Sequence, residues 1–506
     1  MIAPMATDAT VRPPREPSAG PSSDAALSPA IGLSPDAALS PAIGLSPAIG
    51  LSPDAALSPG TGLSPLSPAA AAHNRSRLGV SSWALYDLAN TIFSFNIVSY
   101  LAPLWVLGIY ERLGRGQGEG NLVWGLAIGL SMLLNAIVSP VMGAVSDRAG
   151  VRKPFLLFFT ALCIVPTALG GILGDATGFG FLGLYFWWGL AILAVANFGY
   201  QAALIYYDAM LPEVSTSETR GRVSGIGVGL GYVGTIVGAL VVRVFGFHDG
   251  KPTEFGFVLT AVLFAVLALP VFVVIRERQG RTAHALTKID LRGSWSQIAR
   301  TARHASEFPG LLRFLVARLL YTDPINTVIQ FMAVFATAAV GYSDADAQTV
   351  LILVTVVAII MSFVWGFVVD RVGPKRTLST VLVLWCISLV LAAATLDRTL
   401  FLLVGALAGA ALGGTWVSDR VFMLRLSPPE MVGEFFGLYG LAGKFSAVTG
   451  PVIWGLTLFW LEPSMGRDAY RFAVLAQLVL MVAGFVVLQG VADRPRPVAA
   501  GEVAEA

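Results

Sequence analysis

Five polar side chains lie inside long apolar stretches of this sequence, where such groups are rare and usually functional. Asp87 and Asn90 stand one helical turn apart in one stretch, and Asp323 and Asn326 repeat that spacing in a later one. Lys444 stands in "LAGKFSAVTG", among small residues. A carboxylate can bind a proton, an ammonium group can hold a carboxylate, and an amide can orient either. These five residues are therefore predicted to bind a small polar molecule or a proton.

A structural role for the same groups is an open alternative. Asp323, for instance, could pair with Arg318 and fix helix packing, and a structural role for Asp87 is nearly as well supported as a binding role. Between the two carboxylates, Asp323 is the better candidate for proton uptake. It lies deeper in its apolar stretch and is followed by Pro324, which disrupts a helix.

Other polar and aromatic residues of these stretches receive weaker assignments. The aromatic candidates to line a cavity are Tyr86, Tyr206, Tyr207 and Trp416. Aromatic residues in such positions more often pack against neighbouring helices. The charged residues closest to predicted helix ends are Asp208, Asp419 and Arg420. Contacts with loops and snorkelling are ordinary there, so these three are not assigned to the site.

The composition places these residues in a membrane protein. Of 506 residues, 55% are hydrophobic and 13% are charged, and the mean hydropathy is +0.73, whereas a soluble protein has about 25% charged residues. Cys163 and Cys386 lie in apolar stretches, and the four histidines have no metal-ligand spacing. We therefore expect an integral membrane protein with no metal, no cofactor and no enzymatic site.

Twelve apolar runs are long enough to span a bilayer, which takes about 20 residues each. They cover 82–108, 121–145, 155–174, 179–207, 222–246, 255–275, 311–340, 347–369, 377–396, 399–424, 434–461 and 470–491. The prediction is an all-α membrane protein of two pseudo-symmetric six-helix halves. Its parts are a tail (1–78), a first half (79–275), a central loop (276–310), a second half (311–492) and a C-terminal tail (493–506). The first tail repeats "DAALSPAIGLSP", so we expect it to be disordered.

The distribution of basic residues predicts the orientation of the spans. Most Lys and Arg residues that flank the runs fall on the side that holds both tails and the central loop. Cytoplasmic loops of membrane proteins carry an excess of these residues. Both termini and the central loop are therefore predicted to be cytoplasmic.

Two loop motifs at matching places in the halves predict gates. "GAVSDRAGVRK" (143–153) recurs as "GFVVDRVGPKR" (366–376), each between the second and third spans of its half. The glycine lets another helix approach, and the carboxylate four residues later can meet that helix's N-terminus. An ordinary basic loop would not explain this spacing or its repetition. The residues assigned to gating are Gly143, Asp147, Arg148, Gly150, Arg152, Lys153, Gly366, Asp370, Arg371, Gly373, Lys375 and Arg376.

One glycine pattern is assigned to packing. "GLGYVG" (229–234) has the G-x-G-x-x-G spacing of a dinucleotide-binding turn, but that fingerprint requires a preceding strand. Here it lies within an apolar run that is rich in glycine, where small residues allow close helix packing. No Walker A sequence is present, so ATP hydrolysis by this chain is not expected.

The repeated motif G-x-x-x-D-R-x-G-x-[RK]-[RK] resembles the signature of the major facilitator superfamily. "WALYDLANT" (83–91), "PEVSTSETRGRVSG" (212–225), "ARLLYTDPINT" (317–327) and "FFGLYGLAGKFSAVTGP" (435–451) resemble its vacuole-effluxer-like branch, and the resemblance covers 79–493. Fungal members of that branch export amino acids from the vacuole, and bacterial members are largely uncharacterised permeases. The resemblance implies a twelve-helix bundle, a central cavity, alternating access and a small amphiphilic solute such as an amino acid.

The residues and the resemblance together predict a secondary active transporter in a bacterial-type cell membrane. Its expected partners are the lipid bilayer, a small organic solute and protons, and nucleic acid is not among them. The alternative is a membrane sensor or scaffold that retains the transporter fold without moving a solute. Both loop motifs are complete and the interior charges are present, which favours transport.

Overall fold

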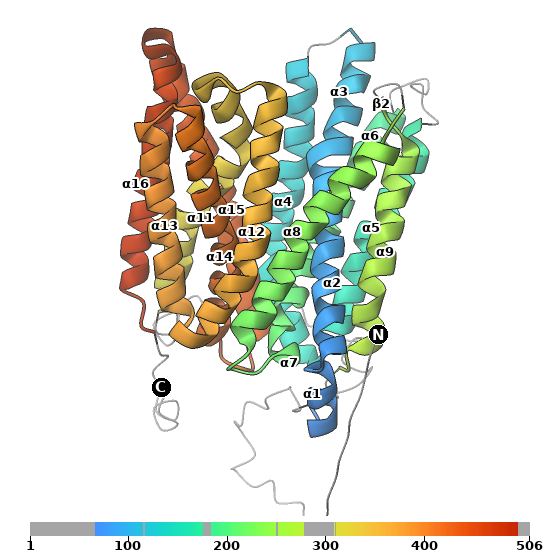
Figure 1. Cartoon of the computed structure of the whole chain (residues 1–506). Helices are drawn as coiled ribbons and strands as arrows, with labels where there is room; N and C mark the ends of the chain where they lie inside the picture. The colour runs from blue at the N-terminus through green and yellow to red at the C-terminus, as the bar shows by residue number, and fades with distance from the viewer. Residues whose placement is uncertain are drawn as a thin grey trace, which may run out of the picture. The chain divides into compact units, whose positions relative to one another are not determined.

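The computed structural model describes residues 66–114, 117–175, 184–248, 251–277, 308 and 310–493. This part of the chain is a bundle of long helices (Figure 1). Its only strands within the described ranges are the two-residue pair β1 (Phe247–His248) and β2 (Lys251–Pro252). The predicted all-helical membrane fold is confirmed.

The described residues of the first half form six helical crossings. The first is α2 (Arg77–Phe93), a π-helical segment (Ser94–Leu101) and α3 (Ala102–Arg112) in succession. The others are α4 (Gln117–Ala149), α5 (Lys153–Asp175), α6 (Leu184–Ala209), α8 (Arg220–Phe245) and α9 (Glu254–Val274). Two short helices lie at one end of these crossings: α1 (Pro68–Asn74) and α7 (Leu211–Val214).

The second half repeats this order. It contains α11 (Leu311–Val334) with a π-helical continuation (Phe335–Val340), α12 (Asp344–Val372), α13 (Pro374–Ala394), α14 (Arg398–Leu426), α15 (Val432–Met465) and α16 (Ala469–Gln489). In the described residues, 11 helical stretches are long and apolar enough to cross a membrane. The last of them, Val432–Gln489, contains both α15 and α16. The described helices are therefore consistent with twelve crossings.

The prediction for the N-terminal tail is wrong in its last part. Residues 1–65 lie outside the described ranges, but α1 forms at Pro68–Asn74 and α2 begins at Arg77. Ser67 caps α1 through its side-chain oxygen. The Asn74 amide exchanges two hydrogen bonds with the Arg276 backbone, of 2.9 and 2.8 Å. These contacts order a segment whose composition alone suggested disorder.

Two other predicted segments fall mainly outside the described ranges. Of the predicted central loop, residues 278–307 and 309 are outside, and of the predicted C-terminal tail, residues 494–506 are outside. The helices α4 and α15 extend past the predicted runs 121–145 and 434–461 at both ends. Their polar end residues continue the helix beyond the apolar stretch, so hydropathy underestimates their length.

The two halves meet along two pairs of helices. In one pair α4 packs against α15, and in the other α8 packs against α12. The pairs are equivalent, because each joins the second crossing of one half to the fifth crossing of the other. Further contacts between the halves come from α8 with α14 and α6 with α15.

Glycines of α8 allow its close packing against both halves. A Cβ atom on Gly225 would lie 2.5 Å from the carbonyl oxygen of Ser362 in α12, and one on Gly234 would lie 2.5 Å from that of Leu88 in α2. Real Cβ atoms do not approach this closely. The glycine pattern of 229–234 is therefore part of a helix-packing surface, as predicted.

Gly234→Ala should lower the thermal midpoint of the purified protein by several degrees, because overpacking costs about 1–3 kcal/mol. The matched control is Gly129→Ala in α4, where an added Cβ meets no atom within 4 Å. Both changes carry the same gain in helix propensity, about 1 kcal/mol, so their difference reports packing. Thermal unfolding in detergent measures it, and equal midpoints would contradict the packing assignment.

Candidate functional site

A cavity of about 470 Å³ lies between the two halves. Its walls come from α2, α4, α6 and α8 of the first half and from α11, α14 and α15 of the second. Four of the five predicted binding residues line it: Asp87, Asn90, Asn326 and Lys444. Of the aromatic candidates, Tyr207 and Trp416 line it as well. Residues from matching helices of the two halves are thus brought to one site.

The other two aromatic candidates are packing residues of the first half. Tyr86 is fully buried, and its hydroxyl shares a 2.7 Å hydrogen bond with Thr160. Tyr206 stacks on Phe155 and Phe159, and its hydroxyl donates to the carbonyl oxygen of Met142. Neither residue is among those that line the cavity.

Lys444 reaches from α15 toward the other half. Its Nζ donates to the hydroxyl of Ser139 in α4 over 3.2 Å, and Ser139 in turn donates to the Asn135 side chain over 2.8 Å. Among the residues that the structure describes, no carboxylate oxygen lies within 4.0 Å of Lys444 Nζ, the distance that defines an ion pair. The ammonium group therefore has room for an anionic partner.

Asp323 does not line the cavity, unlike the other four predicted binding residues. Its side chain is 3% exposed, and its Oδ1 accepts a 2.8 Å hydrogen bond from the N–H of Gly450 in α15. The carbonyl oxygen of Gly450 accepts from Gln477 of α16. Asp323 thus supports α15 just before Pro451, and its assignment as a proton-binding residue remains a prediction.

The suggested pairing of Asp323 with Arg318 is also replaced by another. Arg318 Nε donates to Asp419 Oδ2 over 3.0 Å, and its guanidinium lies 3.5 Å from the ring centre of Tyr439. Asp419 accepts two more hydrogen bonds, from the hydroxyls of Tyr321 (2.6 Å) and Tyr439 (3.1 Å). This buried cluster joins α11, α14 and α15 within the second half.

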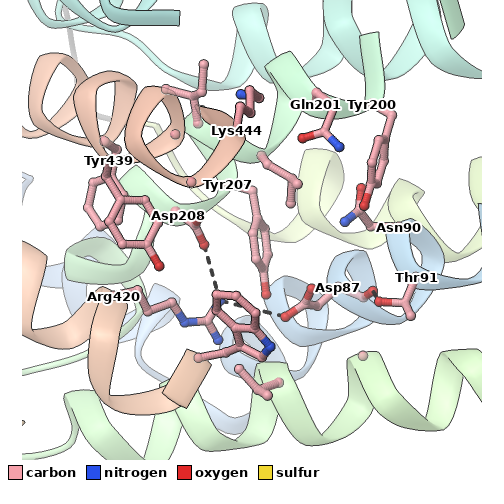
Figure 2. Close-up of a pocket in the computed structure, with 18 of the residues that line it drawn as sticks. Asp87, Asn90, Thr91, Tyr200, Gln201, Tyr207, Asp208, Arg420, Tyr439 and Lys444 are labelled. Atoms are coloured by element: carbon pink, nitrogen blue, oxygen red, sulfur yellow. Dashed lines mark hydrogen bonds and ion pairs between the residues drawn. The ribbon is translucent and has the colours of Figure 1, made fainter. Parts of the chain in front are cut away.

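The prediction that Asp208 and Arg420 make ordinary helix-end contacts is wrong, because both line the cavity. Arg420 Nη1 lies 3.2 Å from Asp208 Oδ1 and 3.7 Å from Asp87 Oδ2 (Figure 2). Arg420 belongs to the second half and both carboxylates to the first. The positions of Asp208 and Arg420 near helix ends did not predict that they line the cavity, because this depends on how the two halves pack against each other.

At one end of the bundle, called the closed end below, two equivalent contacts join the halves. Asp147, near the end of α4, accepts hydrogen bonds from the N–H groups of Gly433 (2.9 Å) and Glu434 (2.8 Å) in the first turn of α15. Unbonded N–H groups and the helix dipole make this turn a favourable place for a carboxylate. A Cβ atom on Gly143 would clash with the carbonyl oxygen of Gly433. The predicted Gly–Asp spacing therefore serves this contact.

The second copy of the motif makes the same contact. Asp370, near the end of α12, accepts from the N–H groups of Gly221 (2.6 Å) and Arg222 (3.1 Å) in the first turn of α8, and from Arg222 Nε (2.8 Å). Gly366 lies against Gly221, where an added Cβ would be 2.9 Å from its carbonyl oxygen. Both halves thus cap a helix of the other half at the same end.

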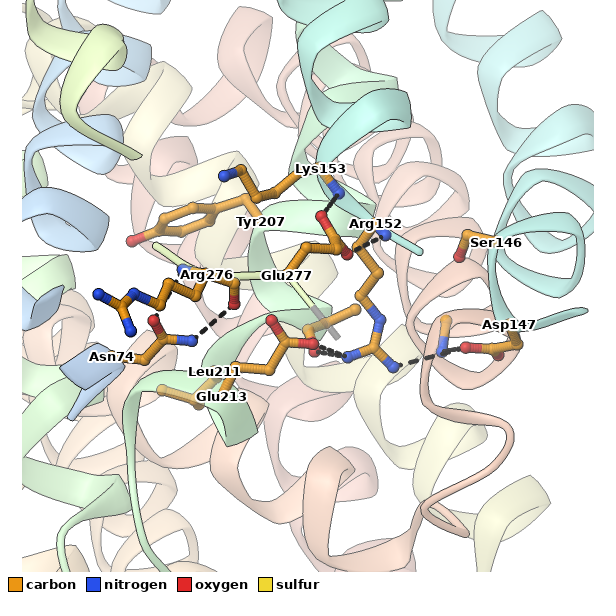
Figure 3. A network of polar contacts seen from close by, with 12 residues as sticks. Asn74, Ser146, Asp147, Arg152, Lys153, Tyr207, Leu211, Glu213, Arg276 and Glu277 are labelled. Carbon is orange, nitrogen blue, oxygen red and sulfur yellow. Dashed lines mark hydrogen bonds and ion pairs between the residues drawn. The ribbon is translucent and has the colours of Figure 1, made fainter. Parts of the chain in front are cut away.

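Basic residues of the first motif tie neighbouring helices together (Figure 3). Arg152 donates from Nη1 to Ala209 O (2.7 Å) and Glu213 (3.2 Å), and its Nη2 lies 3.5 Å from Asp147. The carboxylate of Glu277 accepts from the backbone N–H groups of Arg152 (2.7 Å) and Lys153 (2.9 Å). Arg152 thereby connects Asp147 to the end of α6.

The remaining motif residues have simpler places. Gly150 and Gly373 follow α4 and α12 with positive φ angles of 69° and 97°, which explains glycine at both positions. Lys375 donates to the carbonyl oxygen of Gln489. The exposed arginines of the motifs are Arg148, Arg371 and Arg376.

Comparison with known proteins is consistent with this geometry. Residues 123–496 match the family described as "Vacuole effluxer Atg22 like". The chain belongs to this family. It is 24% identical over 422 residues to the uncharacterised MFS-type transporter YxiO of Bacillus subtilis, a match that covers 81% of this chain and 93% of YxiO. The resemblance seen in the sequence is confirmed.

Fungal members of the family match a shorter part of the chain. Autophagy-related protein 22-1 of Neosartorya fischeri is 26% identical over 292 residues, which is 51% of this chain and 46% of that protein. The chain thus matches about half the length of this fungal relative.

Solved structures share the fold of this Atg22-like transporter. The human organic anion transporter MFSD10 aligns with a TM-score of 0.60 at 15% identity, over 81% of this chain and 98% of that one. A bacterial homologue of the iron transporter ferroportin in an outward-facing state aligns with a TM-score of 0.62, at the same identity and coverage. At this identity the likeness shows the fold alone. The fold is that of a major facilitator transporter, an integral membrane protein.

Asp147→Asn should loosen the closed end, because a neutral amide loses the charge that strengthens both hydrogen bonds to α15. A loss of about 1–2 kcal/mol changes the ratio of states about 5- to 30-fold. With both native cysteines replaced by alanine, spin labels are placed at the exposed positions Arg148 and Glu430. The fraction of molecules with a long distance between the two labels should then increase.

The control for this variant is Asp346→Asn. Asp346 is exposed and lies in the first turn of α12, at the end of that helix far from Asp370. It should leave the distance distribution unchanged. Identical distributions in the Asp147→Asn and unmodified proteins would show that this carboxylate does not hold the end closed.

Proposed function

We propose that this chain is a secondary active transporter that moves a small organic solute across the membrane by alternating access. The observation that carries the proposal is a cavity with walls from both halves, shut at one end by two equivalent carboxylate contacts. Each contact joins helix ends of different halves. A rigid-body motion of the halves can therefore break both together and open the cavity on that side.

The charges in the cavity support a solute that carries a carboxylate. Lys444 bonds to a serine hydroxyl, whereas the two cavity arginines, Arg318 and Arg420, already hold carboxylates. A carboxylate can thus join Lys444 without displacing an ion pair. Asn90 and Asn326 supply further polar contacts from the two halves. The volume lies in the usual range for small-molecule sites, about 300–1,000 Å³, and suits an amino acid or a similar amphiphile.

The proposed energy source is a proton gradient, with Asp323 as the carboxyl group that exchanges the proton. In the described part of the chain its side chain accepts one backbone hydrogen bond and forms no ion pair. Protonation would therefore not leave a cation without its partner. Its contact with Gly450 connects a change of charge to α15, which also carries Lys444.

The proposed orientation follows the positive-inside rule. The closed end carries the two basic loop motifs, and it lies on the same side as α1 and the start of the central loop (Figure 1). We infer that this end faces the cytoplasm of a bacterial-type cell and that the structure is open toward the opposite side.

Lys444→Ala should lower the affinity for a transported, carboxylate-bearing solute about 10- to 100-fold, since hydrogen bonds to charged groups contribute about 1.5–3 kcal/mol. Uptake of labelled amino acids and small monocarboxylates into proteoliposomes, relative to empty liposomes, measures this. Arg243→Ala is the control, because it removes one positive charge from an exposed site outside the cavity. An unchanged KM in Lys444→Ala would remove the residue from the site, and no flux of any solute would argue against transport.

Asp323→Asn should abolish accumulation of the solute driven by a pH gradient and leave solute exchange at equal pH intact, because the amide keeps the hydrogen bond to Gly450 but cannot be protonated. Counterflow and gradient-driven uptake in the same vesicles separate the two activities. Undiminished pH-driven accumulation would exclude Asp323 as the coupling residue.

A further inference from the structure

The guanidinium group of Arg420 extends from the second half into the first half. Besides Asp208 and Asp87, it contacts Ser224 twice: Nε donates to the hydroxyl and Nη2 to the carbonyl oxygen, both over 2.7 Å. Ser224 lies in α8, Asp208 in α6 and Asp87 in α2. Three helices of the first half therefore bind one side chain of α14.

Two aromatic rings of the first half complete this surrounding. The Arg420 guanidinium carbon lies 5.0 Å from the ring centre of Trp83 and 5.9 Å from that of Tyr207. The two rings are stacked 4.5 Å apart, and the Trp83 indole N–H donates to the backbone oxygen of Tyr207. Both rings are fully buried, so their positions are set by packing.

We name this group of residues the acidic cage: Trp83, Asp87, Tyr207, Asp208 and Ser224. It combines two carboxylates, a hydroxyl and two aromatic faces, which together make a receptor for a cation. All five belong to the first half, so the cage moves as one unit with that half. In this structure its occupant is a side chain of the second half.

Alternating access requires Arg420 to leave the acidic cage. When the halves part at the closed end, α14 moves away from α2, α6 and α8, and the guanidinium goes with it. Two carboxylates would then remain close together in a buried site without a counter-charge, which is costly inside a membrane protein. A positive group in the place of Arg420 would remove this cost and favour the opened state.

We propose that the acidic cage is a binding site for an organic cation, either a protonated amine or a guanidinium group, which replaces Arg420 when the closed end opens. Arg420 and the ligand exclude each other, so binding of the cation favours opening of this end. The inference rests on the alternating access proposed above. Access is provided by the cavity, because Asp87, Tyr207 and Asp208 form part of its wall.

The cationic group can belong to two kinds of ligand. One is a simple cation, and the other is a zwitterion whose carboxylate lies at Lys444 on the opposite wall. The shared chemistry is the positive group in the cage. Lys444→Ala distinguishes the two, because it should weaken binding of a zwitterion and leave binding of a simple cation unchanged.

The first test fills the cage from solution. Arg420→Ala leaves space for methylguanidinium, and methylurea is its neutral counterpart of similar shape. Methylguanidinium at millimolar concentration should raise the thermal midpoint of Arg420→Ala saturably and bind at least tenfold more tightly than methylurea by calorimetry. Adding Asp87→Asn and Asp208→Asn should remove the difference. Equal effects of the two compounds on Arg420→Ala would overturn the proposal.

The second test uses the chain with Arg420 in place, and so does not depend on folding of the variant. With spin labels at Arg148 and Glu430, methylguanidinium should increase the long-distance population saturably, and Asp208→Asn should abolish its effect. Methylurea is the control. A distribution that responds to pH but not to 20 mM methylguanidinium would show that protons alone neutralise the cage, and would overturn the cation site.

The two proposals can fail separately. Solute flux in proteoliposomes without any response to methylguanidinium rejects the cation site and keeps the transport function. A saturable response of the spin-label distances without flux of any solute supports the cation site and rejects transport.

Discussion

The arrangement of the molecule depends on a carboxylate placed at the first turn of a helix that belongs to the other half. Asp147 does this for α15 and Asp370 for α8. The interaction is strong because it joins a negative charge to N–H groups that the helix itself cannot satisfy. It is also local, since it involves a single side chain and two backbone groups. Such a contact can hold two large bodies together and still be broken in one step.

The two halves repeat this contact, but they differ in the cavity. The first half contributes Asp87 and Asp208, and the second contributes Arg420, which crosses between them. Within the second half, Arg318 pairs with Asp419. The duplicated framework thus provides the two equivalent contacts at the closed end, and the unequal distribution of charge gives the cavity one acidic and one basic wall.

The sequence predicted the contacts at the closed end better than the cavity for a physical reason. These contacts are made by residues near each other in one repeated motif, and the spacing of Gly143 and Asp147 reflects a contact that each copy makes alike. Which residues line the cavity depends on how the helices of the two halves pack against each other. Asp208 and Arg420 looked like helix-end residues because hydropathy does not report that overlap, and α6 and α14 continue past the apolar run. Asp323 was misplaced because its match to Asp87 in "DPINT" implied an equivalent environment, whereas Gly450 of α15 accommodates its carboxylate away from the cavity.

The glycines at the interface of α8 and α12 affect how quickly the halves can exchange states. At Gly225 and Gly366 the two helices meet through backbone atoms. At these two positions no rotamer has to be reordered when the helices separate or close again. In the alternating access proposed above, this part of the interface would add little repacking to the activation barrier. Bulkier residues on this surface would slow the cycle even where they left both end states equally stable.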